Sequence, residues 1–336
     1  MIDIQFEKEL YYSGETITGN VSINLKKAIS LRSYKITFHG STIIPHKETF
    51  TVENAKLHPY KHQEVHVEKS YYLWKSEDGT NKLPAGYYNW DFSFDLPVNC
   101  PSSFEGEKGF IRYTVQVLID KPWWPDYLRE KPISVCHPTD LNLLPMWKDP
   151  VSFQKETKNV IITISTPNYG CVSGQNIMVS GQIQNQSPQH ITALEGVFRR
   201  VVTTKRTYSD SDNNQKKDFK VYWEDFHVAP WKMKDYCFTL EVPPLVATIR
   251  NSVCLKVEYF IRVKAVMKHK EVKVDLGVLV GNVPLAGEAG EETPEAQQTL
   301  MKGEKAELMA SHFKFGPLFP YFGDGIRKIG VLDSTF

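Results

Sequence analysis

Residues 253–263, VCLKVEYFIRV, contain the longest uninterrupted alternation of apolar side chains in the sequence, at Val253, Leu255, Val257, Tyr259, Ile261 and Val263. Successive side chains of a β-strand point to opposite faces of the sheet, so this period of two predicts a strand with one buried face. Helical segments repeat their apolar residues at a longer period, and no convincing helical repeat occurs before residue 290.

The same alternation recurs on both sides of this stretch. It occurs at residues 2–6, 17–25, 34–38, 88–96, 113–119, 160–164, 177–183, 236–242 and 272–278. Turn-forming segments such as 84–86 (PAG) and 97–103 (PVNCPSS) separate the runs, as expected between antiparallel strands. Many short strands with turns between them predict an all-β fold made of sandwiches or barrels.

The two halves of the chain match each other in order. Gly14 and Phe38 correspond to residues 174 and 198, each 160 positions further on, and the spacing Pro97–Tyr113 recurs as Pro243–Tyr259. Repeated matches in the same order favour a duplication. We therefore predict two tandem antiparallel β-sandwiches, of which the first has about fourteen additional residues between positions 46 and 86.

Composition shifts suggest the domain boundaries. Prolines at 138, 145 and 150 interrupt the strand pattern, although the segment remains apolar enough to pack against a domain. We predict an N-terminal sandwich at residues 1–140, an interdomain linker at 141–158, a C-terminal sandwich at 159–282 and an acidic tail at 283–336.

The tail contains three different patterns. Residues 287–295 (GEAGEETPE) are poor in apolar side chains and predict disorder. Thr293 and Pro294 are typical of a helix N-terminus and predict a short helix over residues 298–309. The aromatic segment 313–322 (FKFGPLFPYF) is either a docking motif or a strand that folds back, and Phe319, Pro320 and Tyr321 are its candidate protein-contact residues.

Charge and cysteine usage exclude several classes of protein. The 40 basic and 39 acidic residues give a net charge of +1, which argues against nucleic acid as a partner. No apolar run is long enough to span a membrane, and MIDIQFEKEL at the N-terminus lacks the pattern of a signal peptide. Five cysteines without a CxxC motif predict reduced thiols in an intracellular protein.

Motifs of enzymes and cofactor sites are missing from the sequence, namely GxSxG, HExxH, the P-loop and a GxGxxG after a strand. His58, His62 and His66 would form a metal-binding stripe on a helix. On the strand that the local pattern favours, consecutive imidazoles are about 13 Å apart, which predicts solvated histidines. No neighbouring groups in the sequence would lower the pKa of a cysteine. We expect no enzymatic activity, no metal and no cofactor.

Two clusters are candidate contact surfaces. A predicted hairpin carries Arg199, Arg200, Lys205, Arg206, Lys216 and Lys217. It would bind phosphorylated peptides or anionic lipid heads, or it is an ordinary solvated hairpin whose charge is partly cancelled by nearby aspartates. Trp123 and Trp124 are adjacent, so one of them is an exposed anchor for a protein partner, or both are covered by a loop over the end of the sandwich.

Several ordered motifs carry a family resemblance that covers about residues 1–282. They are residues 12–21 (YSGETITGNV), 83–86 (LPAG), 90–97 (WDFSFDLP), 111–115 (IRYTV), 140–142 (DLN), 170–174 (GCVSG), 185–187 (NQS) and 242–244 (VPP). The chain resembles arrestin-domain proteins of the α-arrestin group. This resemblance implies the arrestin fold, two immunoglobulin-like sandwiches docked end to end through the linker.

The resemblance also implies a function. Such proteins are non-enzymatic cytosolic adaptors that bind cytosolic regions of membrane receptors or transporters and promote their endocytic trafficking, sorting or ubiquitination. The implied location is the cytoplasm, with peripheral recruitment to the plasma membrane or endosomes. An alternative is a structural coat subunit like the arrestin-like component of retromer, and a further one is an enzyme on an unfamiliar β-sandwich, which would need a pocket with convergent polar groups.

The sequence departs from the family at two functional motifs. Many α-arrestins recruit HECT-type ubiquitin ligases through Pro-Pro-x-Tyr, which is absent here, and Phe319-Pro320-Tyr321 is the nearest tail segment. Receptor-binding arrestins use paired lysines in the first strand, where this chain has only Lys8. The residues of this chain therefore do not support either ligase recruitment through Pro-Pro-x-Tyr or the paired-lysine site of the first strand.

Overall fold

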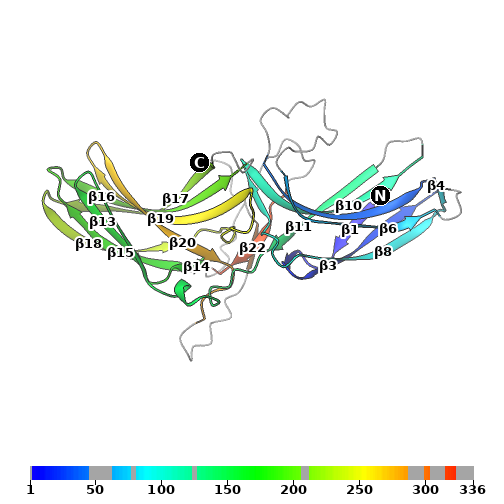
Figure 1. Ribbon diagram of the computed structural model, residues 1–336, viewed down its shortest axis with the longest axis horizontal. Helices are drawn as coiled ribbons and strands as arrows, with labels where there is room; N and C mark the ends of the chain where they lie inside the picture. Colours follow the sequence, from blue (N-terminus) through cyan, green and yellow to red (C-terminus); the bar gives the residue numbers. More distant parts are fainter. Residues whose placement is uncertain are drawn as a thin grey trace.

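The structure is a computed structural model that describes residues 2–44, 63–76, 81–122, 127–205, 212–286, 299–302 and 315–322. Figure 1 shows two β-sandwiches lying end to end. The one helix in the described residues is a single 3-10 turn, η3 (Pro145–Trp147). The prediction of an all-β fold with two tandem sandwiches is thus confirmed. No helix among the described residues is both long and apolar enough to cross a membrane.

The first sandwich has two facing sheets, ordered β1-β3-β8 and β2-β11-β10-β5-β6, with β9 on β10 and a small β4-β7 ladder. Its strands are β1 (Ile2–Phe6), β2 (Leu10–Tyr12), β3 (Thr16–Leu25), β4 (Ile29–Ser30), β5 (Ser33–Ile43), β6 (Gln63–Lys75), β7 (Lys82–Leu83), β8 (Gly86–Asp95), β9 (Phe104–Gly106), β10 (Gly109–Asp120) and β11 (Tyr127–Cys136).

The second sandwich has sheets ordered β12-β13-β15-β18 and β14-β20-β19-β16-β17. Its strands are β12 (Val151–Thr157), β13 (Val160–Thr166), β14 (Gly170–Val172), β15 (Asn176–Asn185), β16 (Ile191–Thr204), β17 (Asn213–Val228), β18 (Lys232–Glu241), β19 (Leu255–Met267) and β20 (Glu271–Gly281). In each sandwich a three-residue strand, β2 or β14, pairs in parallel with the last strand of the larger sheet. This shared topology agrees with the internal repeat.

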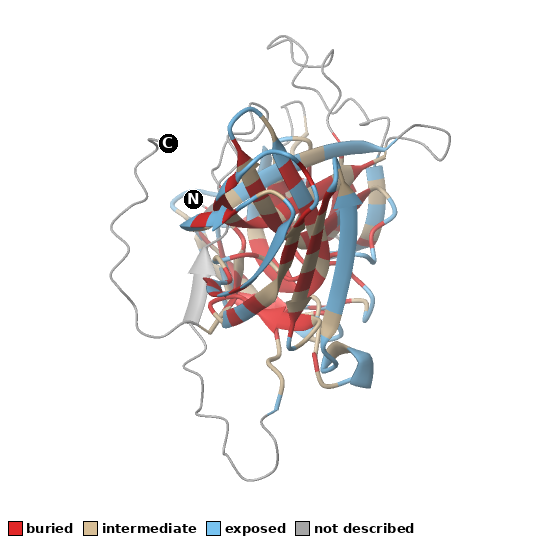
Figure 2. Ribbon diagram, turned by 90° about the vertical axis from the view of Figure 1, so that its left-hand side faces the viewer, coloured by how far each residue is buried: buried red, intermediate tan, exposed pale blue. Residues whose placement is uncertain are grey.

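The predicted period of two is visible as burial. Along β19, the side chains of Leu255, Val257 and Tyr259 are buried and alternate with exposed or half-buried neighbours. Figure 2 shows the same alternation of buried and exposed residues along several other strands. In the strands with this alternation the apolar face therefore lies between the two sheets, and one core cluster runs through both sandwiches.

The segment between the sandwiches is shorter than the predicted linker of residues 141–158. Val151–Thr157 forms β12, which pairs residue by residue with β13 and belongs to the second sandwich. The five central residues of β12 are all exposed, so the strand has no apolar alternation that would predict it. Residues 151–157 form a strand because their backbone hydrogen-bonds to β13.

The tail returns to the body of the molecule. Thr299–Lys302 forms β21, which pairs antiparallel with β22 (Leu318–Tyr321), so the predicted helix over residues 298–309 is wrong at these positions. Pairing with β22 overrides the local helix-start signal, because tertiary contacts outweigh weak helical preferences. Of the two readings of segment 313–322, the structure has the strand that folds back, and β22 lies at the junction of the sandwiches (Figure 1). The disorder predicted for residues 287–295 falls outside the described residues.

Candidate interaction surfaces

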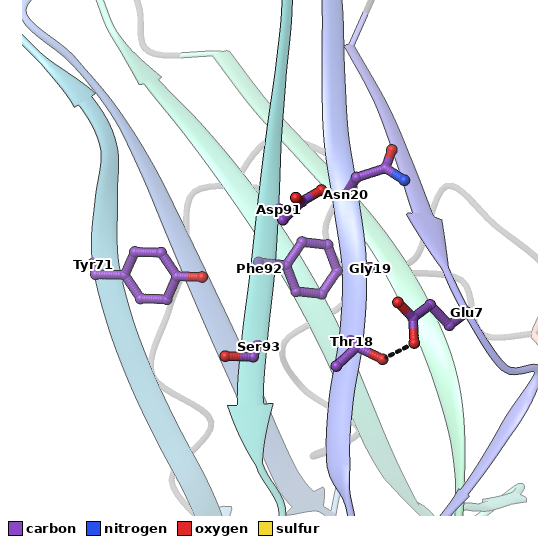
Figure 3. A pocket seen from close by; sticks show the side chains of 8 residues that line it. All are labelled: Glu7, Thr18, Gly19, Asn20, Tyr71, Asp91, Phe92 and Ser93. Carbon is purple, nitrogen blue, oxygen red and sulfur yellow. Dashed lines mark hydrogen bonds between the residues drawn. The ribbon is translucent and has the colours of Figure 1, made fainter.

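A hollow of about 370 Å³ lies along β3 and β8, where Tyr71 of β6 also reaches toward it (Figure 3). It is lined by Glu7, Thr18, Gly19, Asn20, Tyr71, Asp91, Phe92 and Ser93. Glu7 accepts a hydrogen bond from the Thr18 hydroxyl, as the dashed line in Figure 3 marks. The lining contains no histidine, cysteine or cation, so it does not pair a nucleophile with an imidazole base.

Three of the five cysteines are packed as small apolar side chains. All five are free thiols, and Cys100, Cys136 and Cys171 are buried. Burial raises the pKa of Cys100 to about 11 and the pKa of Cys136 and of Cys171 to about 12. At neutral pH these thiols stay protonated, whereas a nucleophilic cysteine needs a lowered pKa.

The predicted histidine stripe is only partly within the described residues. His58 and His62 lie outside them, and His66 is a half-buried residue of β6 that hydrogen-bonds Thr42. The described residues contain no group of three or more His, Cys, Asp or Glu side chains that would hold a metal ion.

Most of the predicted basic hairpin is engaged within the protein. Arg199 pairs with Asp218 through two hydrogen bonds, and Lys205 pairs with Asp212 at 3.0 Å. The Arg199 hydrogen bond holds the pKa of Asp218 below its usual range. Arg200 is only 8% exposed, and its guanidinium lies 5.6 Å from the ring centre of Phe104 in the first sandwich.

Lys216 and Lys217 keep the anion-binding prediction open. Both side chains are exposed on β17, and the Lys217 ammonium also lies 5.4 Å from the ring centre of Phe219. Arg206, Trp123 and Trp124 lie outside the described residues. Among the described basic residues of this hairpin, Lys216 and Lys217 are the exposed ones, at the start of β17.

The tail residues predicted as contacts lie against the body. Phe319 is 4% exposed, Pro320 is also buried, and Tyr321 is half-buried with its hydroxyl 3.1 Å from the Glu241 carboxylate. In this arrangement Pro320 is not accessible to a WW-type groove.

Glu64 forms a polar link between the sandwiches that the sequence analysis did not identify. Its Oε2 atom accepts hydrogen bonds from the Ser252 hydroxyl at 2.7 Å and from the backbone amides of Val253 and Cys254 at 2.9 and 3.1 Å. The partners are 188 to 190 residues apart along the chain. Because the two segments lie so far apart in the sequence, no local sequence pattern predicts that they are in contact.

Thr42 and His66 extend this link within the first sandwich. The Thr42 hydroxyl lies 3.1 Å from Ser252 Oγ and 2.7 Å from His66 Nε2. Ser252 uses its one hydroxyl proton on Glu64, so Thr42 donates to Ser252 and accepts from His66. Burial lowers the pKa of His66, and the Glu64 carboxylate partly opposes this shift. The hydrogen-bond chain requires a proton on Nε2 of His66, which the neutral imidazole provides in its Nε2–H tautomer.

Asn282 forms a second link. Its side-chain carbonyl accepts from the Thr139 amide at 2.7 Å, and its amide nitrogen donates to the His137 carbonyl at 2.7 Å. Nearby, Leu141, Val172 and Leu279 form a small buried cluster joined by Phe322 from the tail. The linker, the second sandwich and the tail therefore share one apolar contact at the junction.

The outer end of the second sandwich exposes apolar and basic side chains together. β17 starts beside the first sandwich, where Gln215 donates to Glu107 at 2.6 Å, and its far end leads into the turn before β18. In and after this turn Trp231 and Met233 are 70% and 66% exposed, with Lys232 between them. Asn185 holds the turn by donating to the carbonyls of Val228 and Ala229, both at 3.2 Å.

Two family models match the chain in tandem. The model described as "Arrestin (or S-antigen), N-terminal domain" matches residues 1–142, and the corresponding C-terminal domain matches residues 156–285. The two matches are separated by the segment that contains η3 and the start of β12.

Curated proteins show the same similarity along most of the chain. Arrestin domain-containing protein 1 of Mus musculus is 27% identical over 94% of this chain and 72% of that protein. The protein of the same name from Homo sapiens is 25% identical over 84% of this chain and 64% of that protein. Arrestin domain-containing protein 4 of Homo sapiens is 23% identical over 88% of this chain and 73% of that protein.

Proposed function

The chain belongs to the arrestin family and is of the α-arrestin type, and from this premise we propose that it is a non-enzymatic cytosolic adaptor. Its cargo would be cytosolic segments of membrane receptors or transporters, whose endocytic trafficking or sorting it would promote. The observation that carries the proposal is the tandem of two arrestin domains, at residues 1–142 and 156–285. Because the chain covers 64% to 73% of the three relatives described above, their whole activity is not assumed for it.

Two long strands support peptide binding. In the described part of the chain, β6 and β17 each pair with a neighbour on one side only, so the other edge presents unpaired backbone groups. An extended peptide can add to such an edge as a further strand. Lys216 and Lys217 on β17 would attract a phosphorylated or acidic segment.

We expect charge reversal at this edge to reduce cargo contact. Full-length chain with Lys216→Glu and Lys217→Glu should label membrane proteins in cells about tenfold less in proximity labelling, equivalent to ~1.4 kcal/mol of binding. The matched control is Lys26→Glu with Lys27→Glu, an exposed lysine pair in the β3–β4 turn. Equal labelling by both double variants and the parent chain would contradict a role for the β17 edge, and no labelled membrane proteins at all would contradict the adaptor function.

Recruitment of a HECT-type ligase is not part of this proposal, since Pro320 is buried and no Pro-Pro-x-Tyr motif is present. One observation favours the alternative of a permanent coat subunit. Leu143, Leu144 and Met146 in the linker are exposed together, and exposed apolar patches are typical of stable interfaces. A coat subunit would co-purify with fixed partners in constant ratio, whereas an adaptor would label many membrane proteins without one.

Membrane recruitment is supported by the outer end of the second sandwich. Tryptophan is favoured at the boundary of the lipid headgroups, and lysines there are attracted to anionic lipids. Trp231, Met233 and the neighbouring lysines 232 and 234 combine both properties on one turn and the strand that follows it. We propose that this end contacts the cytosolic leaflet while the sheet edges hold cargo.

Vesicle flotation tests this contact. The full chain should float with vesicles of phosphatidylcholine and phosphatidylserine and much less with phosphatidylcholine alone. Trp231→Ser with Met233→Ser should weaken binding about a hundredfold or more, since burial of each large apolar side chain contributes about 1.5–3 kcal/mol and each 1.4 kcal/mol is about tenfold. Tyr87→Ser, which removes a 68% exposed aromatic ring from the first sandwich, should have no effect. Unchanged flotation of the double variant would exclude this turn as the membrane contact.

A further inference from the structure

The tail segment 315–322 lies at the junction of the two sandwiches (Figure 1), and we call its position there the slot. The backbone amide of Leu318 donates to Ser134 Oγ of the first sandwich at 2.9 Å. The amide of Phe322 donates to the carbonyl of Ser173 in the second sandwich, also at 2.9 Å. The segment is thus bound through its main chain to both domains at once.

The side chains of the segment fill buried positions in this slot. Phe315 and Phe319 are 9% and 4% exposed, and Pro317 and Pro320 are also buried. Phe322 packs against the small cluster at the junction. Apolar burial supplies affinity, while the two amide contacts determine the direction and register of the segment.

The groups that hold the tail are themselves built into the sandwiches. Ser134 lies on β11, where its backbone pairs with Leu10. The Ser173 hydroxyl donates to the Pro243 carbonyl at 2.8 Å and accepts from the Leu245 amide at 2.9 Å. These contacts hold the two groups in place within the sandwiches, independently of their bonds to the tail.

The slot also distinguishes side chains by polarity. Phe319 enters a buried position, and two residues later the Tyr321 hydroxyl donates to Glu241 Oε1 at 3.1 Å. A carboxylate at this point favours a phenol or another donor and disfavours an acidic side chain. The pattern that fits is an extended segment with an apolar ring, a proline and a donor in succession.

We propose that this slot is a binding site for extended aromatic–proline segments of partner proteins, which take the place of the chain's own residues 315–322. The inference does not depend on membrane cargo, because it rests on the tail contacts alone. The tail is tethered and competes at an effective concentration of about millimolar. A partner segment therefore enters when its protein is already held elsewhere on the adaptor.

A nicked form of the full chain tests the exchange. A protease site placed within residues 287–298 allows the tail to be cut while every residue remains present. The probe is a fluorescent peptide of residues 311–324, SHFKFGPLFPYFGD. We expect the peptide to bind the nicked chain at least about tenfold more tightly than the uncut chain, because cutting removes the tether.

Peptide and protein variants test the assigned contacts. Replacing Phe319 by Ala in the peptide should weaken binding about tenfold or more, whereas the same change at half-buried Leu318 should have a smaller effect. Glu241→Gln in the protein should weaken the Tyr321 peptide but not a peptide with Phe at that position. This selective loss would not follow from a general change in stability.

Several outcomes would overturn the proposal. They are equal peptide binding by nicked and uncut chain, no effect of the Phe319 change, or tail exchange between two copies seen as a concentration-dependent dimer of the uncut chain. If the nicked chain unfolds, the uncut variant Phe315→Ala with Phe319→Ala replaces it. This variant loosens the tail in place and should bind the peptide more tightly than the parent, and failure to do so also refutes the slot.

Discussion

Gly181→Ala should lower the free energy of unfolding by at least about 3 kcal/mol, because the new methyl group has no space. A Cβ at this position of β15 would lie 1.9 Å from the Thr163 carbonyl oxygen and 2.6 Å from the Tyr236 hydroxyl. The carbonyl belongs to the neighbouring strand β13, and the Tyr236 hydroxyl donates to it at 2.7 Å across the glycine. Relief of the clash would require both the ladder and this hydrogen bond to move.

Chemical denaturation measures this effect, with Gly277→Ala as the matched control on β20. A Cβ there would touch only the Phe260 ring, at 3.8 and 3.9 Å. Such a substitution should change stability by less than about 1 kcal/mol, in the stabilising direction if at all, since alanine reduces the entropy of the unfolded chain. Similar unfolding free energies for both variants would contradict the close approach at Gly181.

Glu64→Ala should uncouple the two sandwiches. The substitution leaves the Ser252 hydroxyl and the amides of Val253 and Cys254 without their shared acceptor. An unsatisfied buried donor costs about 1–3 kcal/mol. The Ser252 hydroxyl is buried, whereas the Val253 amide is exposed to water, so we expect a loss of about 1–3 kcal/mol at the junction. Because the lost contacts join two domains, unfolding should change from one transition to two.

Differential scanning calorimetry resolves this change. Glu68→Ala is the control, since Glu68 lies on the same strand β6 but its side chain is exposed. It should leave a single transition and alter stability by no more than about 0.5 kcal/mol. A single unshifted transition for Glu64→Ala would mean that the sandwiches are coupled mainly by Asn282 and the apolar cluster around Leu141.

The predictions for Gly181→Ala and Glu64→Ala differ in how much of their basis can be read from the sequence. Gly181 lies in a run of alternating residues that the sequence already places in a strand, and only its close neighbours come from the structure. Glu64 and Ser252 carry no mark in the sequence, because neither belongs to a motif and they lie 188 residues apart. Contacts between distant surface groups depend on how whole sandwiches dock.

The amino-acid sequence by itself determined the all-β class, the tandem repeat and the family. These properties follow from the spacing of apolar residues along each strand and from short motifs in a constant order, such as Trp90 to Pro97. Both signals depend on residues that are close together along the chain. They can therefore be read from the sequence without knowing which residues meet in the folded protein. The helix signal at Thr293–Pro294 was equally local, and it predicted the wrong structure at Thr299–Lys302 because β22 supplies a partner strand.

Only the tertiary structure decided which functional residues are available and which are engaged. Arg199 and Arg200 resembled an anion site in the sequence, but a neighbouring aspartate and the packing of the two sandwiches occupy them. Phe319 and Pro320 resembled a free docking motif, and the junction buries them. The physical reason is that charge pairing and apolar burial depend on distance in space, which the order of residues along a β-rich chain does not specify.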